Sequence, residues 1–300
     1  MKTFLILLSI AATSLYAKDK VIYGDDNRVD VYANTNPLYA DLAKSTAAMI
    51  SHSKLTKNGT TTTISGGTLE ERGMCSNIKF AEQITAANCS GFLVGPDLMV
   101  SAGHCIRGNM NPTTNQMEYP DCATSSWVFD FAVESEGESA REVPTSSVYN
   151  CVEVLEQKLD RNDQNDFVLF RLDRPVTDRA PLTVRKTGKI TDNQSIVVIG
   201  HPTGLPTKIA DGANVRSNSN PVFFVANLDT FGGNSGSAVF NAETGEVEGI
   251  LVRGENDYVW DTDLEGKRCR VPQVCSPTGC RGEDVTRITN IKKLMEIVNQ

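Results

Sequence analysis

Short runs of β-forming residues, separated by turn residues, follow one another along most of this chain. The runs are rich in Val, Ile, Thr, Phe and Leu, and Gly, Asn, Asp and Pro stand between them. Because no helical pattern intervenes, this succession predicts an all-β sandwich or barrel. The clearest runs cover residues 60–65, 90–94, 98–102, 127–133, 167–172, 195–200, 221–226, 237–241 and 247–252.

Only the C-terminal end has a helical pattern. Ile291, Leu294, Met295 and Val298 recur at the spacing of one helix face, and Asn290 precedes them as a candidate N-cap. We therefore expect a short terminal helix that packs its apolar stripe against the sheet.

The first seventeen residues are typical of a secretory signal peptide. Lys2 supplies a short positive region, residues 4–12 form an apolar run, and Ala17 offers a small residue for cleavage. The apolar run is too short to span a bilayer, and no later run reaches the roughly 20 residues required. We expect a secreted protein, periplasmic or extracellular, without a membrane anchor, although an uncleaved N-terminal anchor is the alternative. Residues 18–40 are expected to form a polar N-terminal arm or a short propeptide.

Eight cysteines agree with export, because an even number in a secreted chain suggests disulfides. A zinc site is the competing interpretation. It is disfavoured by the absence of a Cys-x-x-Cys pair and by the presence of only three histidines, His52, His104 and His201. We expect no metal and no cofactor.

The formal charge of the chain is −8. An acidic protein gains nothing from counterion release on a phosphate backbone, so a nucleic acid is a poor candidate partner. The chain is expected to be a monomer.

Three segments carry residues suited to nucleophilic catalysis. In the first, two β-like runs joined by a Gly-Pro-Asp turn end at His104, and Cys89 and Cys105 bracket the hairpin. The second begins a β-like run at Asp166, after Asn165. The third is Gly-Gly-Asn-Ser-Gly-Ser, residues 232–237, which contains Ser235.

The Ser-Ala-Gly-His-Cys sequence at 101–105 closely resembles the histidine motif of trypsin-like serine proteases, and the Asn-Asp pair resembles their aspartate motif. The loop at 232–237 is similar to the nucleophile loop of the bacterial glutamyl-endopeptidase-like branch. The resemblance implies a chymotrypsin-like fold of two six-stranded antiparallel β-barrels with a C-terminal α-helix. The protease domain would cover residues 41–300, with the first barrel at about 41–180 and the second at about 181–300.

The same resemblance implies the roles of individual residues. His104, Asp166 and Ser235 would form the catalytic triad of a serine endopeptidase that acts through an acyl-enzyme, and the N–H groups of Gly233 and Ser235 would form the oxyanion hole. Cys89 would pair with Cys105. The pairing of the other six cysteines stays open among fifteen arrangements.

The order of the three segments excludes an α/β-hydrolase, because that class needs Gly-x-Ser-x-Gly and a histidine after the nucleophile. Residue 237 is Ser, and no histidine follows His201. The alternatives that stay open are a catalytically inactive protease-fold binding protein and an adhesion module that uses the loop between Cys269 and Cys280. His201 is interpreted as structural or substrate-facing, and His52 as an ordinary strand residue.

Specificity rests on spacing within the family pattern. In trypsin-like enzymes the residue at the floor of the substrate pocket lies six positions before the nucleophile. In this chain that residue is Asp229, and a carboxylate there predicts cleavage after Arg or Lys. Glutamate-specific relatives resemble the chain at Thr230 but need a histidine where this chain has Leu251. The resemblance implies protein or peptide substrates. Arg253 would lie near the rim of the substrate pocket, where it is either solvated or selects acidic residues at a neighbouring subsite.

Overall fold

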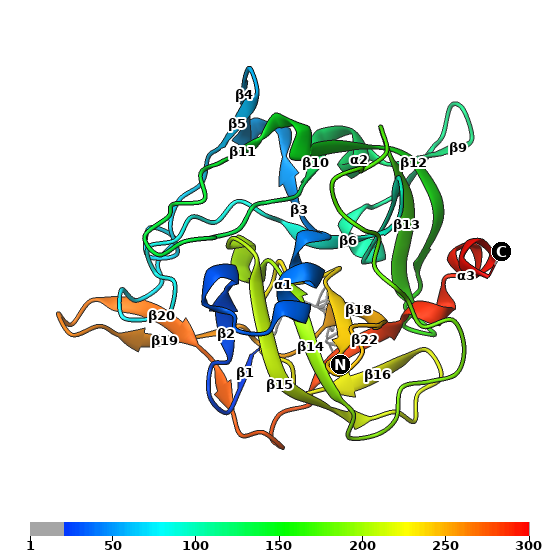
Figure 1. Ribbon diagram of the computed structural model, residues 1–300. Coiled ribbons are helices and arrows are strands. Elements are labelled where there is room, and N and C mark those ends of the chain that lie inside the picture. Colours follow the sequence, from blue (N-terminus) through cyan, green and yellow to red (C-terminus); the bar gives the residue numbers. More distant parts are fainter. Residues whose placement is uncertain (1–20, 300) are drawn as a thin grey trace, which may run out of the picture.

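The computed structural model describes residues 21–299, so the predicted signal peptide lies outside the described residues. Two β-barrels pack against each other (Figure 1). The first is closed and antiparallel, in the order β10-β12-β13-β7-β6-β3. Its strands are β3 (Thr46–Ser51), β6 (Cys89–Gly95), β7 (Leu98–Ser101), β10 (Ser125–Val128), β12 (Val148–Leu159) and β13 (Asp166–Leu172).

The second barrel is a sheet in the order β14-β17-β18-β22-β16-β15, closed because β14 also pairs with β15, and β2 adds to the edge of β15. The predicted fold of two six-stranded antiparallel barrels is therefore confirmed. The strands are β2 (Arg28–Asp30), β14 (Ser195–Gly200), β15 (Lys208–Ser217), β16 (Phe223–Ala226), β17 (Ala238–Asn241), β18 (Val247–Arg253) and β22 (Glu283–Arg287).

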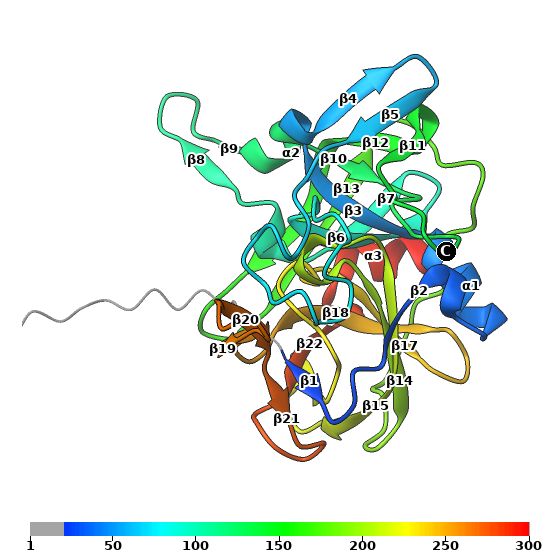
Figure 2. The same cartoon turned by 90° about the vertical axis from the view of Figure 1, so that its left-hand side faces the viewer.

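Smaller elements lie outside the barrels. Figure 2 shows the hairpin β8–β9 extending away from the body, with β4 and β5 above the first barrel. The strands are β1 (Ile22–Tyr23), β4 (Leu55–Asn58), β5 (Thr61–Ile64), β8 (Asn109–Asn111), β9 (Gln116–Glu118), β11 (Glu142–Pro144), β19 (Tyr258–Thr262), β20 (Arg268–Pro272) and β21 (Val274–Cys275). The helices are α1 (Pro37–Lys44), α2 (Pro120–Thr124) and α3 (Lys292–Val298), with 3-10 turns η1 (Val31–Ala33), η2 (His52–Lys54), η3 (Gly103–Cys105), η4 (Thr145–Ser147), η5 (Pro202–Gly204) and η6 (Ile288–Asn290). Within residues 21–299, no helix is long and apolar enough to cross a membrane.

One apolar cluster contains residues of both barrels, and a separate cluster lies within the second barrel. All seven residues of β6 are buried, because one face of this strand lines the first barrel and the other meets the second. Trp127 and Phe170 pack in that core with ring centroids 4.8 Å apart. The junction between the barrels is therefore a rigid place on which to hold a site.

The C-terminal helix forms as expected, although Asn290 does not cap it. The N-cap is Ile291, and the Asn290 side chain instead donates to the carbonyl oxygen of Val222 at 2.8 Å. Ile291 and Leu294 are fully buried in the shared core, so the apolar stripe packs as the pattern predicts.

The segment after residue 20 is folded onto the second barrel. Its strand β1 pairs with β21, β2 pairs with β15, and Val21 is fully buried. Helix α1 follows, where Asn36 accepts a hydrogen bond from the Leu38 N–H at 3.0 Å and so supplies a side-chain cap. This part of the predicted N-terminal arm is thus ordered structure that contributes to the second barrel.

Candidate active site

His104 lies in the 3-10 turn η3, directly after strand β7. The Nδ1 atom of His104 is 2.7 Å from Oδ2 of Asp166, and the backbone N–H of His104 donates to Oδ1 at 3.1 Å. A disulfide joins Cys89 to Cys105 and ties this turn to the start of β6. His104 is thus held through its ring and through its backbone, and 24% of its side chain stays exposed.

Asp166 is the first residue of β13 and is 4% exposed. Burial alone would raise the pKa of this carboxyl, but the charge and hydrogen bonds of His104, with a further contribution from Arg253, hold the pKa below its usual value. Asp166 is therefore a buried carboxylate that contacts both the ring and the backbone N–H of His104.

Ser235 lies in the loop before β17 and is buried against the first barrel. Its carbonyl oxygen accepts from the Ser90 N–H at 2.8 Å and lies 3.6 Å from Sγ of Cys105. The next residue, Gly236, has φ +89°, and a Cβ there would come within 2.1 Å of the Ser90 carbonyl oxygen. The structure thus brings the serine loop to the residue that follows His104.

The loop turns on Gly233, which has φ +95°. Its carbonyl oxygen accepts from the Ser90 hydroxyl at 2.8 Å, and its N–H has no acceptor among residues 21–299. The preceding Gly232 donates its N–H to Asp257 at 2.9 Å. The loop is therefore fixed on both sides, with the Gly233 N–H next to the serine available to a ligand oxygen.

Asp229 accepts hydrogen bonds from the N-terminal segment. Its two carboxylate oxygens accept from the N–H groups of Tyr23 at 2.7 Å and Asn27 at 2.9 Å, and the residue is 4% exposed. Burial raises its pKa to about 6, against the lowering effect of these hydrogen bonds. This differs from the sequence expectation, in which Asp229 faces a substrate at the base of a pocket.

A second carboxylate, which the sequence analysis missed, lies close by. Glu283 begins β22, is fully buried, and accepts from the Thr230 hydroxyl at 2.9 Å. A Cβ on Gly254, which directly follows β18, would come within 1.9 Å of Oε2 of Glu283. This acidic group therefore lies between Thr230, which precedes the serine loop, and the segment after β18. Its sequence signal is weak, because it is one charged residue at the start of a strand.

The remaining predicted pocket residues differ in accessibility. Leu251 is fully buried in the apolar cluster of the second barrel, so its side chain belongs to the core and does not face a substrate. Arg253 forms an ion pair with buried Asp284 at 3.0 Å and donates to the Gln164 carbonyl at 3.0 Å. Both contacts hold the guanidinium beside the Asp166 loop, and this placement leaves little freedom to reach a ligand.

The other two histidines lie apart from this chemistry. His201 is fully buried, stacks on Phe131, and its Nδ1 lies 3.0 Å from the Leu205 carbonyl oxygen. Burial lowers the pKa of His201 to about 3, so the ring is neutral and structural. His52 begins the 3-10 turn η2 and not a strand.

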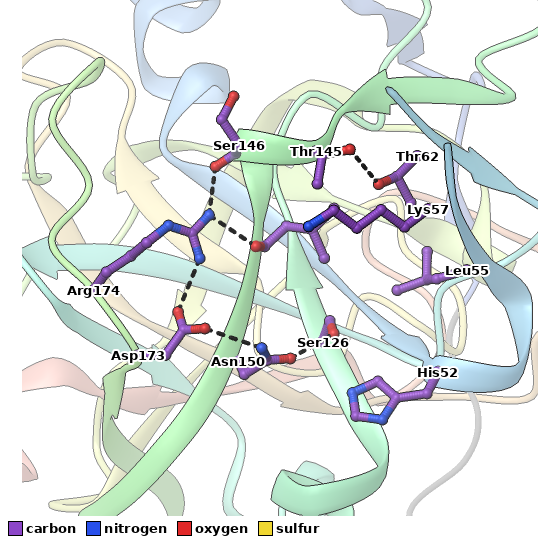
Figure 3. A pocket seen from close by; sticks show the side chains of 11 residues that line it. His52, Leu55, Lys57, Thr62, Ser126, Thr145, Ser146, Asn150, Asp173 and Arg174 are labelled. Carbon is purple, nitrogen blue, oxygen red and sulfur yellow. Dashed lines mark hydrogen bonds and ion pairs between the residues drawn. The ribbon is translucent and has the colours of Figure 1, made fainter. Parts of the chain in front are cut away.

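His52 also lines a cavity of about 550 Å³ on the first barrel (Figure 3). The polar groups of this cavity bond mostly to one another, for example Asn150 to Asp173 at 3.0 Å and Arg174 to the Ser146 carbonyl at 2.7 Å. None of the predicted catalytic residues lines it. A second cavity, of about 350 Å³, borders the serine loop at Gly232 and Gly233.

All eight cysteines are paired, so the three bonds that the sequence left open are now defined. Because Cys269 pairs with Cys75 while Cys280 pairs with Cys275, the loop between Cys269 and Cys280 is not a closed unit. The fourth pair is Cys122–Cys151. Cys89, Cys105 and His104 do cluster, but sulfur atoms joined in a disulfide offer no thiolate to a metal.

Comparisons with known proteins agree with this geometry. The family model of the trypsin-like peptidase domain matches residues 89–250 of the sequence, a stretch that contains His104, Asp166 and Ser235. A comparison with curated proteins yields no match.

Two solved structures are similar to the chain over most of its length. The VesB protease of Vibrio cholerae has 12% identity and a TM-score of 0.50, with 94% of this chain and 68% of that one covered. A Glu endopeptidase in complex with MPD has 16% identity and a TM-score of 0.47, with 93% and 98% covered. At this identity the likeness to VesB concerns the fold alone.

Proposed function

Since the chain belongs to the trypsin-like peptidase domain family, a family of serine-type endopeptidases, we propose that His104, Asp166 and Ser235 are its catalytic triad. The observation that carries this proposal is the two-point contact between His104 and the buried Asp166, with Nδ1 and Oδ2 2.7 Å apart. That contact lies at the barrel junction, where the serine loop also packs.

The contact fixes what the ring can do. A carboxylate accepts from Nδ1–H, so the neutral ring carries its proton there and leaves Nε2 as an acceptor. During attack, Nε2 takes the proton of the Ser235 hydroxyl while Oγ forms a bond to the carbonyl carbon of the peptide. The negative Asp166 stabilises the imidazolium that results.

Collapse of the tetrahedral intermediate breaks the peptide C–N bond, and the imidazolium returns its proton to the leaving amine. A water molecule then repeats the sequence on the acyl-enzyme and releases the acid. We assign stabilisation of the oxyanion to the N–H groups of Gly233 and Ser235. Loss of one such donor costs typically about 3 kcal/mol in related chemistry.

We further propose that the enzyme prefers Arg or Lys before the scissile bond, and we assign this preference to Glu283 in place of Asp229. Glu283 is buried between Thr230, which precedes the serine loop, and Gly254. A long cationic side chain entering between these segments would meet a carboxylate that the protein already keeps from water, and that arrangement favours a charge-assisted pair. Asp229 supports this role less well because backbone N–H groups occupy both of its oxygens.

We also propose that the protein is secreted. Four disulfides within residues 21–299 require an oxidising compartment for their formation, and this agrees with the signal peptide that residues 1–17 predict.

The assignment is tested by Ser235→Ala with Ser219→Ala, an exposed serine, as the matched control. We expect the first variant to lose peptide hydrolysis and labelling by a fluorophosphonate probe while its circular dichroism spectrum stays native. The control should keep both activities. Labelling of the Ser235→Ala protein at wild-type level would refute the triad. A folded wild type that neither labels nor cleaves would favour a catalytically inactive binding protein.

A further inference from the structure

The cavity of about 350 Å³ beside the serine loop is basic, although the chain as a whole is acidic. Lys54, Arg72 and Arg270 line it, together with one carboxylate, Asp257. Tyr258 stacks on Phe231 with centroids 5.0 Å apart and forms an apolar wall. The cavity therefore gathers three cations from three separate segments at one place.

The contacts that the structure gives these cations are to uncharged groups. Lys54 Nζ donates to the Ala86 carbonyl at 2.8 Å, and Arg72 donates to the Thr85 hydroxyl at 2.9 Å. Arg270 donates to the Arg72 carbonyl at 2.8 Å. Burial, and then the charge of Arg72, lower the pKa of Lys54, which agrees with two cations held close together.

A disulfide connects two of the segments that line this cavity. Cys75–Cys269 joins the segment that carries Arg72 to strand β20, which carries Arg270. The Cys75 N–H donates to the Arg270 carbonyl at 3.0 Å, and the Arg270 N–H donates to the Gly73 carbonyl at 3.1 Å. The two guanidinium groups are thus positioned by fixed backbone and do not meet by chance.

The position of the cavity indicates whether the substrate residues before or after the scissile bond would bind there. The leaving amine takes its proton from His104, so the residues after the scissile bond lie on the histidine side of Ser235. Asn88 lines the cavity and immediately precedes Cys89, whose disulfide partner Cys105 follows His104. The cavity therefore lies on the leaving-group side, whereas Glu283 is in the second barrel, behind the serine loop.

We propose that this cavity is a subsite for an acidic side chain, Asp or Glu, within the first two residues after the scissile bond. The inference rests on the proposed function, since it assigns a substrate class to the same catalytic site. Lys54, Arg72 and Arg270 would pair with the substrate carboxylate, and Tyr258 would pack along its aliphatic part. A charge-assisted contact at a partly exposed position changes kcat/KM by roughly tenfold.

The test uses fluorogenic peptides with Lys before the cleaved bond that differ only in Glu, Gln or Lys at the first or the second following position. At low salt, the wild type should cleave the Glu peptide about tenfold faster at one of the two positions. The ratio should fall as NaCl is raised, because salt screens partly exposed charges. Arg72→Gln and Lys54→Gln should each reduce the ratio, and Arg72→Glu should favour Lys over Gln at that position.

The matched control is Lys57→Gln, which removes an exposed cation that lines the other cavity, the one on the first barrel. This variant should keep the wild-type ratio. Equal cleavage of the Glu and Gln peptides by an active wild type would overturn the subsite and leave the triad intact. A wild-type ratio in Arg72→Glu would overturn it as well. Failure of the wild type to cleave any of the peptides would instead refute the proposed function and the subsite together.

Discussion

Replacement of Glu283 by Gln should remove the preference for cleavage after Arg or Lys. Gln has nearly the same shape and can still accept the hydrogen bond from Thr230, which Glu283 accepts at 2.9 Å. The side chain is fully buried, so the change removes a charge without opening a cavity. The fold should therefore survive while the electrostatic partner of a basic substrate side chain disappears.

The size of the effect follows from Coulomb's law. Two unit charges about 4 Å apart interact by about 4 kcal/mol at an effective dielectric constant of about 20. Each 1.36 kcal/mol corresponds to a factor of ten in rate, and a neutral amide oxygen retains part of the hydrogen bond. We expect kcat/KM for Lys and Arg peptides to fall by roughly a hundredfold to a thousandfold, with only a small change for an Ala peptide.

The assay measures kcat/KM on three peptides that differ only in Lys, Arg or Ala before the cleaved bond. The matched variant is Asp229→Asn, which removes the other buried carboxylate, already bonded to the N–H groups of Tyr23 and Asn27. This variant should keep the preference for Lys and Arg. If Asp229→Asn loses the preference and Glu283→Gln keeps it, the assignment from the structure is wrong and the sequence spacing was the better guide.

Two further outcomes concern stability, measured by urea unfolding in the inactive Ser235→Ala background. The pKa of Asp229 is raised from 3.8 to about 6, so between these pH values the folded protein keeps a proton that the unfolded chain releases. The free energy of unfolding should therefore fall by about 3 kcal/mol as the pH rises from below 3.8 to above 6. The Asp229→Asn variant should not show this pH-dependent fall. Replacing Cys75 and Cys269 by Ser removes a disulfide that spans 194 residues, and the chain-entropy relation predicts that the free energy of unfolding falls by about 5 kcal/mol. For the disulfide between Cys275 and Cys280, which spans five residues, the same relation predicts a fall of about 2 kcal/mol. An equal loss for the two disulfides, or pH profiles that coincide, would contradict these expectations.

The histidine segment could be interpreted from sequence because its surroundings are local. A strand, a turn and a second strand within sixteen residues place His104 beside Cys105 and return the chain next to Cys89. The same holds for the serine loop, where the glycines at 233 and 236 meet the needs of a backbone with positive φ. Short-range geometry of this kind can be predicted from consecutive residues.

Local patterns failed where a distant segment competed for the same groups. The run at 127–133 was expected to be one strand, but β10 ends at Val128 because Asp130 takes φ +62° and pairs with Arg179. Spacing alone also predicted Asp229 as the pocket floor, whereas N–H groups more than two hundred residues earlier in the sequence bind its oxygens. Neither competitor is visible in the neighbouring residues.

The all-β architecture, the family and the three segments that carry the proposed triad could be predicted from consecutive residues, since each depends on residues within one turn or hairpin. The contacts of Glu283 and the pairing of the other six cysteines became visible only in the folded chain. Glu283 reaches Gly254 because β22 pairs with β18, aligning Arg253 with Asp284, and Cys75 meets Cys269 across 194 residues. Such contacts arise when barrels close, and closure brings together residues whose separation along the chain carries no local signal.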